Sequence, residues 1–229
     1  MHQPLAKRVV AEALGTFFLL AAVVGSGIMA ERLANGNTAL ALLANTVATG
    51  AALVALIITF AQLSGAHFNP VVTLSFALRQ DLLWSEVPFY VLAQLAGGIA
   101  GVMAANLMFG LPVVFMSQHP RTGPAQLFSE FIATLGLVSV ILAASRSTIA
   151  VVAIAVGTYI SAAYWFTAST SFANPAVTVA RSLSDTFAGI QPSDVPGFVV
   201  AQLAGSIAAT ILFGWLIPAE YDEQLPQAN

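Results

Sequence analysis

The stretches that decide the fold are His67-Phe68-Asn69-Pro70-Val71 and Phe172-Ala173-Asn174-Pro175-Ala176. Each holds an Asn-Pro pair inside strongly apolar sequence. Asparagine is a favoured N-cap residue, and proline is tolerated at the first position of a helix because its missing N–H is not needed there. Each Asn-Pro pair therefore predicts the start of a helix.

The composition predicts a membrane protein. Of the 229 residues, 58% are hydrophobic and only 7% are charged, and the mean hydropathy is +0.86. A soluble domain usually carries about 25% charged residues. The net charge of -3 gives no indication of nucleic-acid binding. The chain has no cysteine and its three histidines are scattered, so no cofactor and no metal site is expected.

Six segments are long and apolar enough to cross the roughly 30 Å hydrocarbon core, which takes about 20 helical residues. They cover residues 9–30, 38–60, 88–110, 126–144, 148–168 and 196–217. The helices that start at Asn69 and Asn174 can each run only about 10 residues before polar sequence follows, which is about 15 Å, or half of the core. We therefore expect two half-helices that meet end to end.

The two halves of the chain resemble each other. Residues 11–16 match residues 129–134, and residues 93–100 match residues 201–208. Each half holds three spans, an odd number, so the second half must cross the membrane in the opposite sense. The sequence predicts one channel domain over residues 1–229, with an inverted repeat of about 1–115 and 120–229.

The paired half-helices predict a path for neutral solutes. A helix N-terminus carries about half a positive charge and several unpaired N–H donors. Two such ends at the membrane centre, with the side-chain amides of Asn69 and Asn174, would bind uncharged hydrogen-bonding molecules and oppose cations. Irregular backbone at this depth is tolerated only where it lines a cavity. The backbone expected to do so belongs to Gly65, Ala66, His67, Ser169 and Thr170.

These motifs resemble the two Asn-Pro-Ala boxes of the aquaporin and aquaglyceroporin (major intrinsic protein) family. The resemblance covers nearly the whole chain, including the sequence around Glu12 and the Ala-Gln-x-x-Gly pattern of spans three and six. It implies an all-α membrane protein of six transmembrane helices and two re-entrant half-helices. It also implies a homotetramer in the lipid bilayer, with one pore per subunit. The pore motifs are then Asn69, Pro70, Val71, Asn174, Pro175 and Ala176.

The sequence departs from the family at the expected outer filter. Val177 directly follows the second box, where the family typically has arginine. Family spacing places the other filter positions at Thr49, Ala162 and Ser171. All four are small and uncharged, so we expect a wide filter without an arginine. It would pass glycerol, urea and metalloid hydroxides such as arsenous acid (arsenite), as well as water. In this the chain is similar to bacterial aquaglyceroporin-like channels linked to arsenic handling.

Several alternatives stay open. The chain could be an orthodox water-selective aquaporin, or an ion-coupled secondary transporter with Glu12 and Glu130 as proton-relay groups. Otherwise these two acids are buried acceptors for N–H groups of the pore loops. His67 is either a gate or a loop residue, and Arg181 is either an outer charge or the end of a half-helix. An enzyme is not expected, because no Ser-His-Asp set or nucleophilic cysteine occurs.

The basic residues give a weak orientation signal. One side of the expected topology carries Lys7, Arg8, Arg79 and Arg146, and the other carries Arg32, Arg121 and Arg181. Cytoplasmic loops carry an excess of Lys and Arg. The bias predicts cytoplasmic N- and C-termini for a multi-pass protein of the cell membrane, and the resemblance to bacterial channels implies the bacterial inner membrane.

Overall fold

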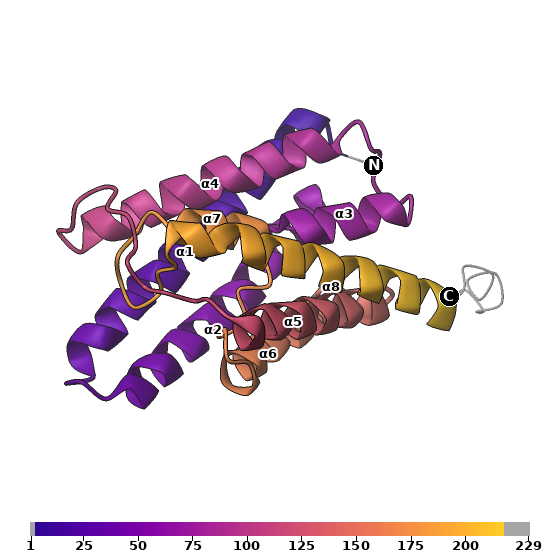
Figure 1. The fold of residues 1–229 in the computed structure, drawn as a ribbon. Helices are drawn as coiled ribbons and strands as arrows, with labels where there is room; N and C mark the ends of the chain where they lie inside the picture. Colours follow the sequence, from indigo (N-terminus) through magenta and orange to yellow (C-terminus); the bar gives the residue numbers. More distant parts are fainter. Residues whose placement is uncertain (1–2, 218–229) are drawn as a thin grey trace.

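The computed structural model describes residues 3–217, and within this range the chain is helical with no named strand (Figure 1). Six helices are long and apolar enough to cross a membrane. The helices are α1 (Leu5–Leu33), α2 (Thr38–Ser64), α3 (Pro70–Leu78), α4 (Val87–Met108), α5 (Pro124–Ala144), α6 (Ile149–Phe166), α7 (Pro175–Arg181) and α8 (Val195–Leu216), with a 3-10 turn at Pro192–Asp194. The six predicted spans and two predicted half-helices are confirmed.

The half-helices begin as their sequences predict. Asn69 is the N-cap of α3, and its side-chain oxygen accepts from the N–H of Val71 at 3.1 Å. Asn174 caps α7 by accepting from Ala176 N at 2.9 Å. The two helices have 9 and 7 residues, which gives lengths of about 14 and 11 Å. Neither can cross a bilayer alone.

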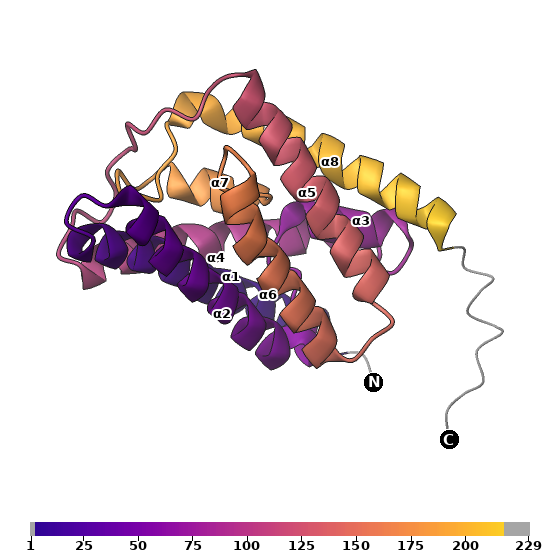
Figure 2. The ribbon, with the colours of Figure 1, turned by 90° about the horizontal axis from the view of Figure 1, so that it is seen from below.

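The long helices form two matching groups around the half-helices. Figure 2 shows α1, α2 and α4 on one side, α5, α6 and α8 on the other, and α3 and α7 between them. Close packing within each group depends on equivalent glycines. A Cβ on Gly97 of α4 would collide with the carbonyl of Ala13 in α1, and one on Gly205 of α8 would collide with the carbonyl of Phe131 in α5. Small residues allow helix backbones to approach closely in lipid.

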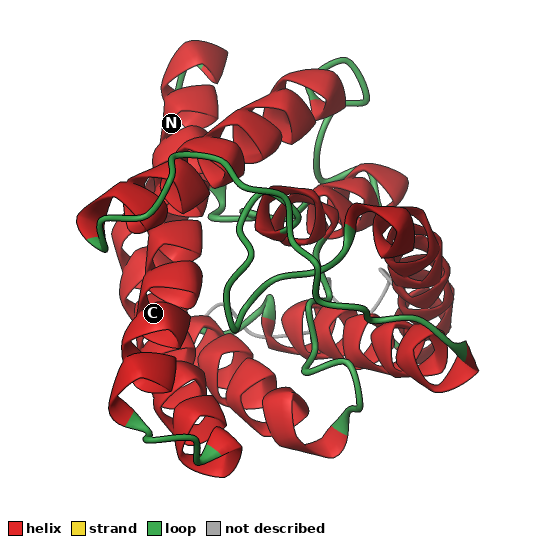
Figure 3. Ribbon diagram, turned by 60° about the vertical axis from the view of Figure 1, so that its left-hand side comes forward, coloured by secondary structure: helices red, strands yellow, loops and turns green. Residues whose placement is uncertain are grey.

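Long connections cross one end of the bundle (Figure 3). The segment between α4 and α5 pairs with the segment after α7: Ser117 N donates to Ser182 O at 2.9 Å, and Gln191 N donates to His119 O at 2.7 Å. At the opposite end lie the start of α1 and the end of α8 (Figure 1). The loop segments are therefore fixed relative to the half-helix that they cover.

Candidate functional site

The two pore loops bind each other through their asparagines. Asn69 Nδ2 donates to the carbonyl of Ala173 at 2.8 Å, and Asn174 Nδ2 donates to the carbonyl of Phe68 at 2.8 Å. Each side-chain oxygen caps its own half-helix, so every asparagine joins one helix start to the opposite loop. An amide NH₂ group has two N–H donors. One therefore remains on each asparagine for a molecule in the pore.

Two buried carboxylates hold the loops in shape. Glu12 accepts from His67 N at 3.0 Å and Phe68 N at 2.7 Å. Glu130 accepts from Phe172 N at 2.9 Å and Ala173 N at 2.8 Å. The loops contain left-handed non-glycine residues, which persist only where the surroundings enforce them; these are Ala66, Phe68, Thr170, Ser171 and Ala173. The carboxylates provide that constraint.

Each carboxylate is itself fixed by a glutamine from the Ala-Gln-x-x-Gly pattern. Gln94 Nε2 donates to Glu12 at 2.8 Å and Gln202 Nε2 donates to Glu130 at 2.6 Å. Both acids are fully buried and lie outside the lining of the central cavity. Their geometry is that of buried acceptors in equivalent places of the two repeats.

A cavity of about 240 Å³ passes both asparagines. One end reaches Ser147 and Ile149, where α6 begins, and the other reaches Tyr164 and Arg181. The lining of α6 thus extends over about 15 residues, or about 23 Å of helix, which is most of a hydrocarbon core. The wall is mainly aliphatic, with lining residues that include Leu19, Val23, Leu53, Ile57, Val156 and Ile160.

Of the loop residues expected to line the path, Gly65, Ala66 and His67 do so. Ser169 is fully buried and lies outside the cavity lining; its carbonyl accepts from Arg121 at 3.3 Å. Thr170 lines a second, outer pocket of about 410 Å³. The structure therefore does not place these two residues along the central cavity, and Arg121 from another loop contacts the carbonyl of Ser169.

The imidazole of His67 lies against the first half-helix. Its Nδ1 is 3.1 Å from Thr73 Oγ1, and its ring stacks on Phe76 with 4.7 Å between centroids. In the described residues no group of three or more His, Cys, Asp or Glu side chains could hold a metal ion.

Two arginines stand where the cavity meets the outer pocket. Arg181, the last residue of α7, is 2% exposed; its Nε donates to the carbonyl of Ala188 and its guanidinium lies 3.5 Å from the ring centroid of Phe172. Arg121 donates from Nε to Gly189 O at 2.7 Å and lies 4.9 Å from the Phe172 centroid. Both guanidiniums line the outer pocket.

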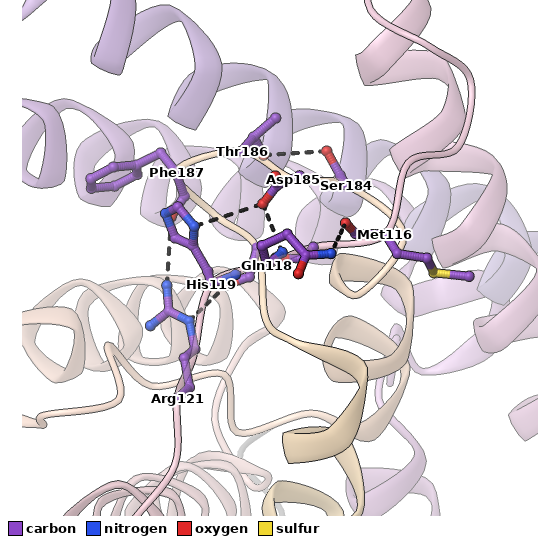
Figure 4. A network of polar contacts seen from close by, with 10 residues as sticks. Met116, Gln118, His119, Arg121, Ser184, Asp185, Thr186 and Phe187 are labelled. Carbon is purple, nitrogen blue, oxygen red and sulfur yellow. Dashed lines mark hydrogen bonds and ion pairs between the residues drawn. The ribbon is translucent and has the colours of Figure 1, made fainter.

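The loop that carries Arg121 is fixed by polar contacts (Figure 4). Gln118 N donates to Asp185 Oδ1 at 2.8 Å, and His119 Nδ1 lies 3.8 Å from the same oxygen. The N–H of Arg121 itself donates to Asp194 at 2.7 Å. The loop that carries Arg121 is therefore fixed by the carboxylates of Asp185 and Asp194.

Comparison with known proteins now decides the family. A family model described as Major intrinsic protein matches residues 1–151 and 144–228. The chain belongs to the major intrinsic protein family. Membership makes it a transmembrane channel protein and not an enzyme.

Individual relatives agree with this assignment. The chain is 58% identical over 213 residues to a protein of Rhizobium meliloti (strain 1021) named aquaglyceroporin AqpS. The aligned region covers 93% of this chain and 91% of that protein. The chain is 34% identical over 205 residues to aquaporin NIP1-4 of Oryza sativa subsp. japonica, covering 86% and 72%. The X-ray structure of the aquaglyceroporin from Plasmodium falciparum has the same fold, with a TM-score of 0.76 and 21% identity over 96% of this chain and 100% of that one.

The outer end of this major intrinsic protein differs from the expected filter at one position. Thr49, Ser171 and Val177 line the cavity, whereas Ala162 is exposed and lies outside it. Tyr164 takes its place and donates to Thr49 Oγ1 at 3.3 Å. Two residues rotate a helix by about 200°, so Ala162 and Tyr164 face opposite sides of α6. The spacing typical of the family therefore predicts Ala162 at a position that Tyr164 occupies.

The filter expected to lack an arginine has one close beside it. The position after Asn-Pro-Ala is indeed Val177, but Arg181 lies four residues further along the same half-helix. Residues four apart lie on one face of a helix, and both line the cavity. Arg181 fits both interpretations left open by the sequence, because it is the last residue of α7 and also lines the outer pocket.

Proposed function

We propose that this major intrinsic protein is a passive channel for glycerol, urea, metalloid hydroxides such as arsenous acid, and water. The observation that carries the proposal is the cavity that passes Asn69 and Asn174 between aliphatic walls and reaches from Ile149 to Arg181. Aliphatic walls suit the carbon side of a polyol, and the asparagine amides suit its hydroxyl groups. The 58% identity to a protein named aquaglyceroporin supports the same choice of solutes.

The proposed outer filter consists of Thr49, Tyr164, Ser171 and Val177. Thr49 and Tyr164 form its polar edge through their hydroxyl contact. Ser171 Oγ has no hydrogen-bond partner among the described residues. Hydroxyl groups in proteins are normally satisfied, so a water or solute hydroxyl in the filter is the expected partner. Val177 keeps the side opposite to these hydroxyls apolar and uncharged.

Charge exclusion is assigned to the centre of the pore. The N-termini of α3 and α7 both point at the place where the asparagines meet. Their dipoles are unfavourable for any cation and favourable for neutral molecules that accept hydrogen bonds. Protons are opposed for the same reason, because hydronium would face two positive helix ends.

One observation favours the second candidate function, a water-selective channel. Arg181 places a bulky cation at the end of the cavity, and a narrower mouth would admit water and exclude polyols. The transporter alternative has less support. Glu12 and Glu130 each accept hydrogen bonds on both carboxylate oxygens, which leaves neither placed to pass a proton along the cavity.

We further propose a homotetramer in the bacterial inner membrane with cytoplasmic termini, formed by a single channel domain of two repeats over about 1–115 and 120–229. The terminal residues lie outside the described range, but the start of α1 and the end of α8 share one end of the bundle (Figure 1). Large apolar side chains on the outer faces of α1 and α2, such as Phe18 and Val47, are exposed. Mass determination of the detergent-solubilised protein and accessibility of terminal tags would test these points.

The solute proposal is tested in vesicles that contain the purified protein. Light scattering under osmotic gradients gives water, glycerol and urea permeability, and uptake of arsenous acid is measured directly. Glycerol permeability well above that of empty vesicles supports the proposal. High water permeability with no glycerol flux would replace it with the water-selective function.

A further inference from the structure

Arg181 lies at the boundary between two spaces. Among the described residues it alone lines both the central cavity and the outer pocket. It is almost fully buried, and its Nε is engaged with the carbonyl of Ala188. Within the part of the chain that the structure describes, its two terminal nitrogens have no hydrogen-bond acceptor. A buried guanidinium with free N–H donors at this boundary can donate hydrogen bonds to a solute that enters the cavity.

The inverted repeat gives independent support for this orientation. Arg181 follows Asn174 by seven residues, and Phe76 follows Asn69 by the same number. Phe76 also lines the cavity, at its other end. The ring two residues before each asparagine stacks on this position: His67 on Phe76 at 4.7 Å, and Phe172 under Arg181 at 3.5 Å. The position therefore faces the pore in both halves.

Among the described residues Arg181 has no direct ion-pair partner, and the buried carboxylate of Glu130 acts on it only through longer-range electrostatic attraction. The charged or titratable side chains that line the outer pocket are Glu31 from α1, His119 and Arg121 from the loop before α5, and Arg181 itself. His119 lies next to Asp185, and Glu31 is exposed at the pocket's rim. Within the described residues no carboxylate forms an ion pair with Arg181 or Arg121. The side chains that line the inner part of the outer pocket therefore carry two positive charges, and the nearest interacting carboxylate, Glu130, lies outside the lining.

We propose that Arg181, supported by Arg121, is the selectivity-determining cation of the outer mouth, one helical turn beyond the position that follows Asn-Pro-Ala. Its terminal N–H groups donate to the hydroxyl oxygens of entering neutral solutes, and its charge opposes K⁺ and hydronium before they reach the half-helix dipoles. This proposal rests on the channel function proposed above and adds a location for cation exclusion. It also explains why the outer mouth carries a positive charge although Val177 is uncharged.

The competing explanation is a purely structural role, in which Arg181 only ties α7 to the segment at Ala188. Charge and structure can be separated by three variants. Arg181→Lys keeps the charge but loses the planar fork. Arg181→Gln removes the charge, and Val177→Arg in the Arg181→Gln background returns a guanidinium to the same face one turn deeper. Arg32→Gln is the matched control, because Arg32 is also a basic residue near the outer loops but lies outside both cavity linings.

The measurement is leak of protons and K⁺ into vesicles, each value divided by the water permeability of the same preparation. A pH-sensitive dye under a K⁺ diffusion potential reports proton entry. For Arg181→Gln we expect about a 30-fold rise in leak, the factor for a unit charge about 8 Å from the ion at an effective dielectric constant of about 20. Arg181→Lys and Arg32→Gln should stay close to the unmodified protein, and the double variant should return to its level.

Two results would overturn the inference. One is an unchanged leak in Arg181→Gln with normal water permeability. The other is an equal rise in Arg181→Lys and Arg181→Gln that Val177→Arg does not reverse, which is the pattern of a structural role. Failure of the proposed function looks different: the unmodified protein would carry no glycerol, whatever the leak of its variants.

Discussion

Replacing Glu130 by glutamine tests whether this acid holds the second pore loop. Its carboxylate accepts from Phe172 N at 2.9 Å, Ala173 N at 2.8 Å and Gln202 Nε2 at 2.6 Å. In Glu130→Gln one oxygen becomes an NH₂ group, which cannot accept from these donors. A hydrogen bond to a charged group contributes about 1.5–3 kcal/mol, and two of them are weakened or lost, so we expect a destabilisation of about 3–6 kcal/mol.

Thermal unfolding of the detergent-solubilised protein measures this effect. For a chain of this size, that loss of stability lowers Tm by about 10 °C, and water permeability should fall because the loop no longer holds Asn174 in register. Glu31→Gln, at an exposed glutamate, should leave Tm unchanged. If Glu130→Gln keeps both Tm and water permeability, the carboxylate does not support the loop. Loss of proton-driven uptake at unchanged Tm would instead support a relay role.

Four further substitutions test the packing and the filter. Val177→Arg adds a guanidinium beside Arg181 and should lower glycerol permeability at least about tenfold, the effect of about 1.4 kcal/mol, with a smaller effect on water, by light scattering. Ala162→Leu should leave both permeabilities unchanged, whereas Tyr164→Ala should raise glycerol permeability. The reverse pattern would show that Ala162, and not Tyr164, lies in the filter. Gly97→Val places a branched side chain against the Ala13 carbonyl, and overpacking of about 1–3 kcal/mol should lower Tm.

The parts of the fold that depend on local sequence could be predicted. Asparagine is favoured at the N-cap and proline at the first helical position, and both predicted caps are present at Asn69 and Asn174. The six spans follow from apolar length alone. The inverted arrangement follows from an odd number of spans per repeat. Each of these steps needs only neighbouring residues or a count, and none needs a tertiary contact.

The parts that depend on contacts between distant segments could not be predicted. The bond from Asn69 to the Ala173 carbonyl joins residues of opposite repeats, and no local pattern encodes it. The loop with Arg121 reaches the outer pocket through pairing with the segment after α7. The sequence already offered Arg181 as an outer charge, and the four-residue spacing from Val177 places both on the same helix face. Which of Ala162 and Tyr164 faces the cavity depends on the packing of α6 against α2, where Tyr164 contacts Thr49.

The two ends of the pore are formed by equivalent backbone positions of the two repeats, but these positions carry different side chains. Equivalent positions carry His67 and Phe76 at one end, and Phe172 and Arg181 at the other. A pair of rings at one mouth and a ring with a cation at the other give different barriers to ions. For a neutral solute, however, the free-energy profile is the same in both directions, so this asymmetry cannot make flux one-way. The outer arginine can set which molecules enter the pore, while the concentration gradient alone sets the direction in which they move.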